Sequence, residues 1–230
     1  MRIQVWRGDI TQAKADAVVD PANCSLYGGR GVDGAIRRVG GPAIAEACRE
    51  LRETTLRDGL ATGQAVATKA GDLPVDWVIH TAGPIYSRAL DRSGTLASCY
   101  RECLRVADRL RVGSIAFPTI SAGAFGWPVA DATWIAVHAV HAVLASASKV
   151  ERAVMVAFSD AAEAGYRSAL DHVRQVHTAK LGSRPRPRPR NAGTRAGSRG
   201  AADFAGLLSE HVSYDSGLDQ ERPCEWVGAG

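Results

Sequence analysis

The residues of this chain best suited to chemistry lie in one stretch, Asp20–Gly34, which reads D-P-A-N-C-S-L-Y-G-G-R-G-V-D-G. Two polar side chains in it, Asn23 and Asp33, are surrounded by glycines. Glycine has no Cβ, so its backbone N–H can approach an anion closely, and a following helix N-terminus adds roughly half a positive charge. The stretch therefore predicts a site for a phosphate-bearing ligand. The alternative is a flexible connection in which Asn23 makes a turn and Asp33 caps a helix.

The flanking segments place this stretch between a strand and a helix. Ala17–Val19 is a short apolar run with two β-branched residues, which is typical of a buried strand. Apolar groups in 35–39 recur at helical spacing, so a helix is predicted to begin near Val32 or Asp33.

The rest of the chain up to residue 177 alternates strand-like and helix-like segments. Strands are predicted over 3–6, 64–69, 77–82, 114–117 and 152–158, and helices over 42–56, 95–110, 129–147 and 161–173. This alternation predicts an α/β layered fold with a largely parallel sheet, whose ligands bind beyond the carboxyl ends of the strands. The polar and glycine-rich segments follow the predicted strands, where that rule places a site.

Composition sets further bounds. The 230 residues are 46% hydrophobic and carry a net charge of +4, too small for a strong overall field toward nucleic acid or membrane. Five cysteines, an odd count without a C-x-x-C pair, argue against a disulfide framework or a structural zinc site. We therefore expect a reduced, cytoplasmic protein without a membrane segment, since no apolar run approaches the ~18–20 residues that a span requires.

The character of the sequence changes near residue 177. Residues 184–190 alternate Arg and Pro, and 202–230 are acidic on balance. We therefore expect a folded domain over 1–177 and a disordered tail over 178–230. Such an arginine tail either contacts nucleic acid weakly, without reading its sequence, or only keeps the protein soluble.

Two common nucleotide motifs fail here. Residues 29–34 match G-x-G-x-x-G, but eight residues separate them from the predicted strand end, and no strand-end acid follows ~20 residues later. The G-K-[ST] of a phosphate-binding P-loop is absent from the sequence.

Five segments in fixed order fit a different family. They are G-D-I-T (8–11), P-A-N…G-G-R-G-V-D-G (21–34), V-I-H-T-A-G-P (78–84), F-P-T-I-S-A-G-A-F-G (117–126) and the strand that ends at Phe158. Together they resemble the macro domain over about residues 1–176, in particular the mono-ADP-ribosyl hydrolases whose first loop reads N-A-A-N…G-G-G-G-V-D-G. The resemblance implies a three-layer α/β/α sandwich with a mixed, largely parallel central sheet, and ADP-ribose binding without a cofactor or metal.

The resemblance also implies a role for individual residues at the adenine and diphosphate. Asp9 would accept a hydrogen bond from the adenine amino group beside the Ile10 N–H, and Phe158 would pack on the adenine face. Backbone N–H groups of one loop would wrap the diphosphate, and Phe125 would border the distal ribose. That loop comprises Ser121, Ala122, Gly123, Ala124 and Phe125.

At the distal ribose the implied catalytic residues are Asn23, which would hold the hydroxyls, and Asp33, which would activate a water beside the anomeric carbon. Further contacts are implied for Asp20, Gly29, Arg30, Gly31 and Val32. His80, at a strand end, is interpreted as a structural histidine.

Two departures from the family pattern affect this prediction. Asp20 stands where the pattern has its first Asn, and an ionised Asp cannot donate a hydrogen bond. Arg30 stands where the pattern has its third loop glycine, which brings a cation to the rim of the pocket. The expected activity is removal of ADP-ribose from a protein carboxylate, O-acetyl-ADP-ribose or a nucleobase. The alternative is a module that binds ADP-ribose without cleaving its link to an acceptor.

Overall fold

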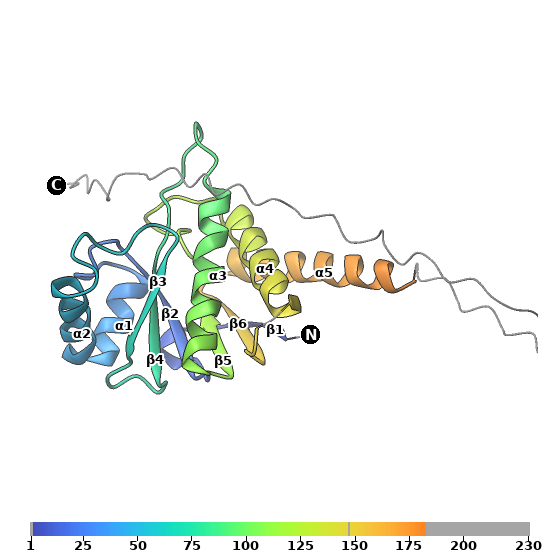
Figure 1. The fold of residues 1–230 in the computed structure, drawn as a ribbon. Helices are drawn as coiled ribbons and strands as arrows, with labels where there is room; N and C mark the ends of the chain where they lie inside the picture. The colour runs from blue at the N-terminus through green and yellow to red at the C-terminus, as the bar shows by residue number, and fades with distance from the viewer. Residues whose placement is uncertain (1, 147, 183–230) are drawn as a thin grey trace, which may run out of the picture.

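The computed structural model describes residues 2–146 and 148–182, which form a six-stranded sheet with helices on both faces (Figure 1). The strand order is β1-β6-β5-β2-β4-β3, and only the pairing of β3 with β4 is antiparallel. The strands are β1 (Ile3–Arg7), β2 (Ala17–Ala22), β3 (Ala65–Lys69), β4 (Trp77–Ala82), β5 (Ser114–Phe117) and β6 (Arg152–Ala157). The mixed, largely parallel sheet confirms the predicted fold class.

The helices divide between the two faces of the sheet (Figure 1). One face carries α1 (Val32–Gly40) and α2 (Pro42–Glu53), and the other carries α3 (Ser93–Leu110), α4 (Val129–Ser146) and α5 (Asp160–Gly182). Because side chains alternate along a strand, Val18 packs on the α1–α2 side, whereas Ala17 and Val19 pack on the side of α3, α4 and α5. The sandwich therefore has two separate cores.

β2 extends beyond the predicted Val19 and includes Pro21, although proline lacks the N–H that a central strand needs. The register explains this. β2 pairs with β5 only at Ala17 and Val18, so Pro21 lies beyond that ladder. On its other side β2 pairs with β4 along its full length.

Most helix bounds lie within three residues of the prediction, but α5 is longer. It begins at Asp160 and continues past His177 to Gly182, so the predicted boundary near 177 falls inside a helix. The remaining tail, 183–230, lies outside the described residues. α4 is long and apolar enough, by length and composition alone, to cross a membrane. In this fold it packs between α3 and α5, with Ala136, Val137 and Val140 in the core.

A chain that ends at Gly182 is expected to keep the cooperative unfolding of the full chain, because the buried side chains of the described region end at Val173. In reducing buffer its melting temperature should stay within about 3 °C of the full chain's. A chain that ends at Gly165 is the control, since it loses Tyr166, Ala169 and Leu170 from the core. Loss of the transition in the 1–182 chain would show that the tail completes the fold.

Candidate functional site

The loop after β2 is built around the side-chain amide of Asn23. Its Oδ1 accepts hydrogen bonds from Ser25 Oγ (2.7 Å) and the Leu26 N–H (3.0 Å), and its Nδ2 donates to the Gly28 carbonyl (2.8 Å). Leu26 is held at φ 59° with its side chain fully buried. Asn23 therefore makes the turn that the sequence offered as one alternative. Its amide keeps one N–H that can still donate to a ligand.

Asp33 lies in the first turn of α1, but it does not cap the helix. The N-cap is Gly31, at φ 66° and without a side-chain capping bond. The Asp33 Oδ1 accepts from Arg37 Nε at 2.6 Å, while its buried Oδ2 has no hydrogen-bond partner within the described part of the chain. A Cβ on Gly29 would lie 2.9 Å from Oδ2, so glycine at 29 lets the carboxylate approach the loop backbone.

Burial raises the pKa of Asp33 to about 6, and the nearby charge of Asp20 acts in the same direction. The hydrogen bond and charge of Arg37 oppose this rise, as does the charge of His80. A carboxyl group with a pKa near neutrality can take up and release a proton under ordinary conditions. This property suits the role of a general base.

Asp20 lies beneath the loop rather than on its surface. Its side chain is 0% exposed, and its Oδ2 lies 2.8 Å from His80 Nδ1 on the neighbouring strand. His80 Nε2 is 2.9 Å from Thr68 Oγ1. A side chain with no exposed surface makes no direct contact with a ligand in this conformation, so Asp20 reaches the site through its charge. The structural interpretation of His80 fits this arrangement.

Asp20 and His80 form a buried ion pair. Burial alone would lower the pKa of His80, but hydrogen bonds to Asp20 and Cys48 and the charge of Asp20 outweigh it and raise the pKa to about 9. His80 is therefore an imidazolium ion at neutral pH. Cys48 links this pair to Arg37, because its Sγ lies 3.7 Å from His80 Nε2 and 3.6 Å from Arg37 Nη2.

The second glycine-containing loop, Ser121–Gly126, follows β5. It begins at Ser121 with φ 63° and ends at Gly126 with φ 72°, and the Trp127 N–H donates to the Ser121 carbonyl at 3.1 Å. Gly123 and Ala124, between these ends, are exposed. A Cβ added at Gly123 would meet nothing within 4 Å, so the backbone here is open to a ligand.

Asp9 and Phe158 follow neighbouring strands, since Arg7 of β1 pairs with Ala157 of β6. Asp9 Oδ1 caps the short helix η1 (Ile10–Gln12) by accepting from the Thr11 N–H and Oγ1, both at 2.9 Å. Phe158 is 80% exposed, so it is not a core residue. Its ring face is free to pack on a flat apolar group.

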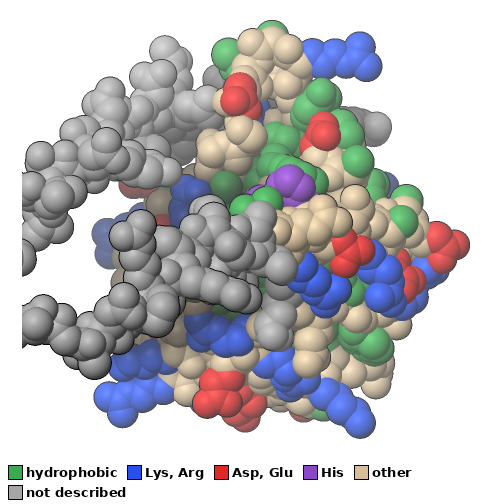
Figure 2. Space-filling view, turned by 90° about the vertical axis from the view of Figure 1, so that its right-hand side faces the viewer, with side chains coloured by type: hydrophobic (Ala, Val, Ile, Leu, Met, Phe, Trp, Pro, Cys, Tyr) green, Lys and Arg blue, Asp and Glu red, His purple; other side chains and the backbone are tan. Residues whose placement is uncertain are grey.

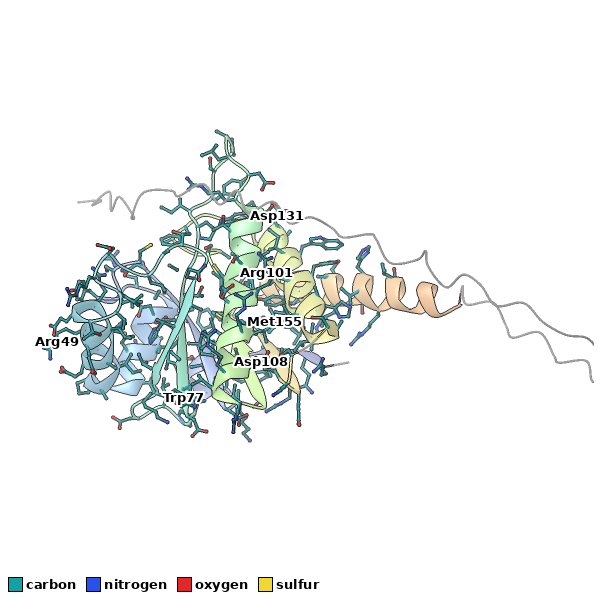
Figure 3. All side chains as sticks on the ribbon, viewed as in Figure 1. Arg49, Trp77, Arg101, Asp108, Asp131 and Met155 are labelled. Atoms are coloured by element: carbon teal, nitrogen blue, oxygen red, sulfur yellow. The ribbon has the colours of Figure 1, made fainter. Side chains whose placement is uncertain are left out.

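The expected site residues therefore lie at one end of the sheet, beyond the carboxyl ends of the parallel strands β1, β2, β5 and β6. In the first loop Gly29, Arg30 and Gly31 are exposed, and Val32 is half-buried. Trp77, the first residue of β4, marks the opposite end of the strands in Figure 3. Four of the expected site residues are buried, namely Ile10, Asp20, Asp33 and Ser121. A buried side chain at Ile10 suits the role implied for this residue, which uses only its backbone N–H.

None of the expected site residues lies in 86–93, a segment that lines a hollow of about 730 Å³ with Trp127, Asp131, Trp134 and Ile135. Asp131 is labelled near it in Figure 3. The hollow adjoins the second loop, because the Tyr86 N–H donates to the Phe125 carbonyl at 2.8 Å. Figure 2 shows histidine atoms among apolar side chains on one face of the molecule. Trp134, which lines the hollow, stacks on His138 and packs beside His172.

Three of the cysteines, Cys48, Cys99 and Cys103, are free and buried. Among the described residues no group of three or more His, Cys, Asp or Glu side chains could hold a metal ion.

Replacing Asp20 by Asn should remove a pH dependence of stability. The folded pKa of His80, about 9, lies above its ordinary 6.5, so the pair's contribution is fully present below pH 6.5 and is lost as pH rises through 9. Urea unfolding of the native chain should show a loss on the order of 2–3 kcal/mol over that window. Equal pH slopes in the native chain and Asp20→Asn would contradict a charged pair.

Comparison with known proteins identifies the family. The family model of the macro domain matches residues 19–136. A macro domain-containing protein of Streptomyces coelicolor is 56% identical over 148 residues, 64% of this chain and 88% of that protein. An O-acetyl-ADP-ribose deacetylase of Klebsiella pneumoniae is 43% identical over 169 residues, 73% of this chain and 95% of that protein.

Solved structures agree with these relatives. A glycine-to-valine variant of the Oceanobacillus iheyensis macrodomain, solved with ADPR, is 35% identical with a TM-score of 0.72, covering 75% of this chain and 94% of its own. Two further variants of the same macrodomain are also solved. One has alanine in place of an asparagine, and the other has alanine in place of an aspartate ten positions later. The replaced glycine lies three positions before that aspartate. The fold, the loops and these relatives together show that the chain belongs to the macro domain family.

Proposed function

We propose that this macro domain binds ADP-ribose and hydrolyses its link to a mono-ADP-ribosylated acceptor. The observation that carries the proposal is the carboxylate of Asp33, which is buried, has a pKa raised to about 6, and turns an unpartnered oxygen toward the glycine loop. Asp20 Oδ1 is also unpartnered, but the Asp20 side chain has no exposed surface, whereas Asp33 Oδ2 lies beside the exposed Gly29 of the loop. The neighbouring Asn23 retains a donor for a ribose hydroxyl.

The relatives support the same residues. Asn23 and Asp33 are ten positions apart, as are the asparagine and aspartate replaced in the Oceanobacillus iheyensis variants. In that protein a valine three positions before the aspartate is compatible with bound ADPR, and the corresponding spacing here gives Arg30. A side chain at this position of the loop is therefore consistent with ligand binding. The deacetylase relative supports a small ester, O-acetyl-ADP-ribose, among the substrates.

In the proposed reaction the ligand lies across the carboxyl ends of the strands, with its adenine at Asp9 and Phe158 and its distal ribose at Asn23. A water beside the anomeric carbon attacks that carbon and gives its proton to Asp33. The bond between this carbon and the acceptor breaks, and its electron pair leaves with the acceptor. Positioning of the water and ribose lowers the barrier together with proton transfer, which typically contributes 10²–10⁴-fold.

The alternative function is a reader that binds ADP-ribose without releasing it. One observation favours it: both ends of the Asn23 amide already hydrogen-bond to its own loop. Incubation with a mono-ADP-ribosylated protein separates the two functions. A hydrolase releases free ADP-ribose at a rate above the blank, whereas a reader retains the modified protein and releases none.

Binding should depend on Asp9 and Phe158. Asp9→Asn keeps the Oδ1 that caps η1 but places an amide donor where the adenine amino group needs an acceptor. We expect this variant and Phe158→Ala each to weaken ADP-ribose binding about ten-fold in calorimetry. Asp160→Asn, which changes an exposed acid close to Phe158, is the control and should bind like the native chain. Absence of saturation at millimolar ADP-ribose in the native chain would exclude this ligand.

Turnover should depend on the ionised form of Asp33. Because its pKa is about 6, kcat/KM should fall as pH drops below 6, approaching ten-fold per pH unit. Asp33→Asn should lose at least about 100-fold in kcat and change ADP-ribose affinity by less than about three-fold. Asp91→Asn, at an exposed acid of the 86–93 segment, is the matched control. A native rate in Asp33→Asn would remove Asp33 from the reaction.

A further inference from the structure

Arg37, which is not among the expected site residues, lies on α1 one turn after Asp33. Its guanidinium makes two well-defined hydrogen bonds, from Nε to Asp33 Oδ1 at 2.6 Å and from Nη2 to the Leu26 carbonyl at 3.0 Å. Its stem covers Gly28, where an added Cβ would lie 3.4 Å from Arg37 Cδ and Nε. The Arg37 side chain is only 14% exposed, so these contacts are sheltered from water.

Each of these hydrogen bonds constrains one of the two candidate catalytic residues. The Nε bond fixes one oxygen of Asp33, which leaves Oδ2 toward the glycine loop. The Nη2 bond holds the carbonyl of Leu26, and the N–H of the same residue donates to Asn23 Oδ1. Leu26 has a positive φ of 59°, a conformation that L residues adopt only where the surroundings hold them. A planar, preorganised guanidinium can hold both groups in one fixed geometry.

Arg37 also balances the negative charge of the Asp33 carboxylate. Asp33 is faced by Arg37 from its own helix, by Asp20 from β2 and by His80 from β4, while Cys48 of α2 contacts both cations. Asp20 and His80 form a pair whose charges largely cancel. Arg37 is therefore the cation that compensates Asp33. A buried carboxylate that loses its cation partner takes up a proton instead of remaining charged.

We propose that Arg37 is the positioning residue of this site, whose single guanidinium orients the carboxylate of Asp33 and, through the Leu26 carbonyl, the amide of Asn23. Arg37 does not touch the reacting atoms in this proposal. The kinetic part rests on the proposed hydrolase function. The effect of Arg37 on the ionisation of Asp33 does not, and it is measurable in the unliganded protein.

The kinetic test compares Arg37→Met, Arg37→Lys and the control Arg38→Met, which removes an exposed arginine from the same helix. Arg37→Met should lower kcat more than ten-fold with little change in KM, and should move the acidic limb of the pH profile upward by about one pH unit. Arg37→Lys keeps a charge but not the fork. Because the charge is kept, the acidic limb of the pH profile should return toward pH 6. Because the fork is lost, kcat should stay low. Arg38→Met should match the native chain.

The second readout is the titration of the Asp33 carboxyl carbon by NMR, without substrate, in the native chain and the same variants. Arg37→Met should raise the midpoint by about one pH unit or more, and Arg38→Met should leave it unchanged. This result upholds the effect on ionisation even if no variant or native chain turns over. An unchanged midpoint in Arg37→Met would overturn the proposal. If Arg37→Met does not fold, Arg37→Gln takes its place with the same criteria.

Discussion

The site depends on the burial of two carboxylates under one loop, each matched by one cation. Asp20 is paired with His80 and Asp33 with Arg37, and all four side chains lie on the α1–α2 side of the sheet. Removing a carboxylate from water costs several kcal/mol, which only a well-placed opposite charge and hydrogen bonds offset. Each cation therefore offsets part of the cost of burying its carboxylate beneath the loop.

The sheet register makes the lower pair possible. β2 and β4 are parallel neighbours in which Asp20 lies opposite His80, and the alternation of side chains turns both toward α1 and α2. A shift of one residue in either strand would turn one of them to the other face and leave a buried charge without its partner. The antiparallel edge strand β3 adds Thr68, whose hydroxyl lies within hydrogen-bonding distance of the second nitrogen of His80.

Local sequence patterns predicted the α/β class and one feature of the site, while the mixed sheet and the site residues were implied by the resemblance to the macro domain. Alternating strands and helices gave the layered architecture, and the asparagine of the first loop was correctly offered as a turn residue. Pairings distant in sequence were not predictable: Asp20 and His80 are 60 residues apart, and nothing local shows that one meets the other. The Asp33–Arg37 pair is local, but i,i+4 acid–base pairs are common on exposed helix faces, where each contributes only about 0.3–0.5 kcal/mol. Only tertiary burial distinguishes this pair from the exposed Glu163–Arg167 pair of α5.

Asp33 also shows why such a site is a weak point of the fold. A carboxyl group whose pKa rises on folding, here to about 6, destabilises the folded state at every pH where it is charged. The fold could have avoided this cost with an amide or an apolar residue at position 33. The residues around Asp33 instead accommodate its negative charge. Arg37 donates a hydrogen bond to one carboxylate oxygen, and glycine at position 29 makes room for the other. Residues that reduce stability in this way are expected where a buried charge serves a reaction rather than the packing.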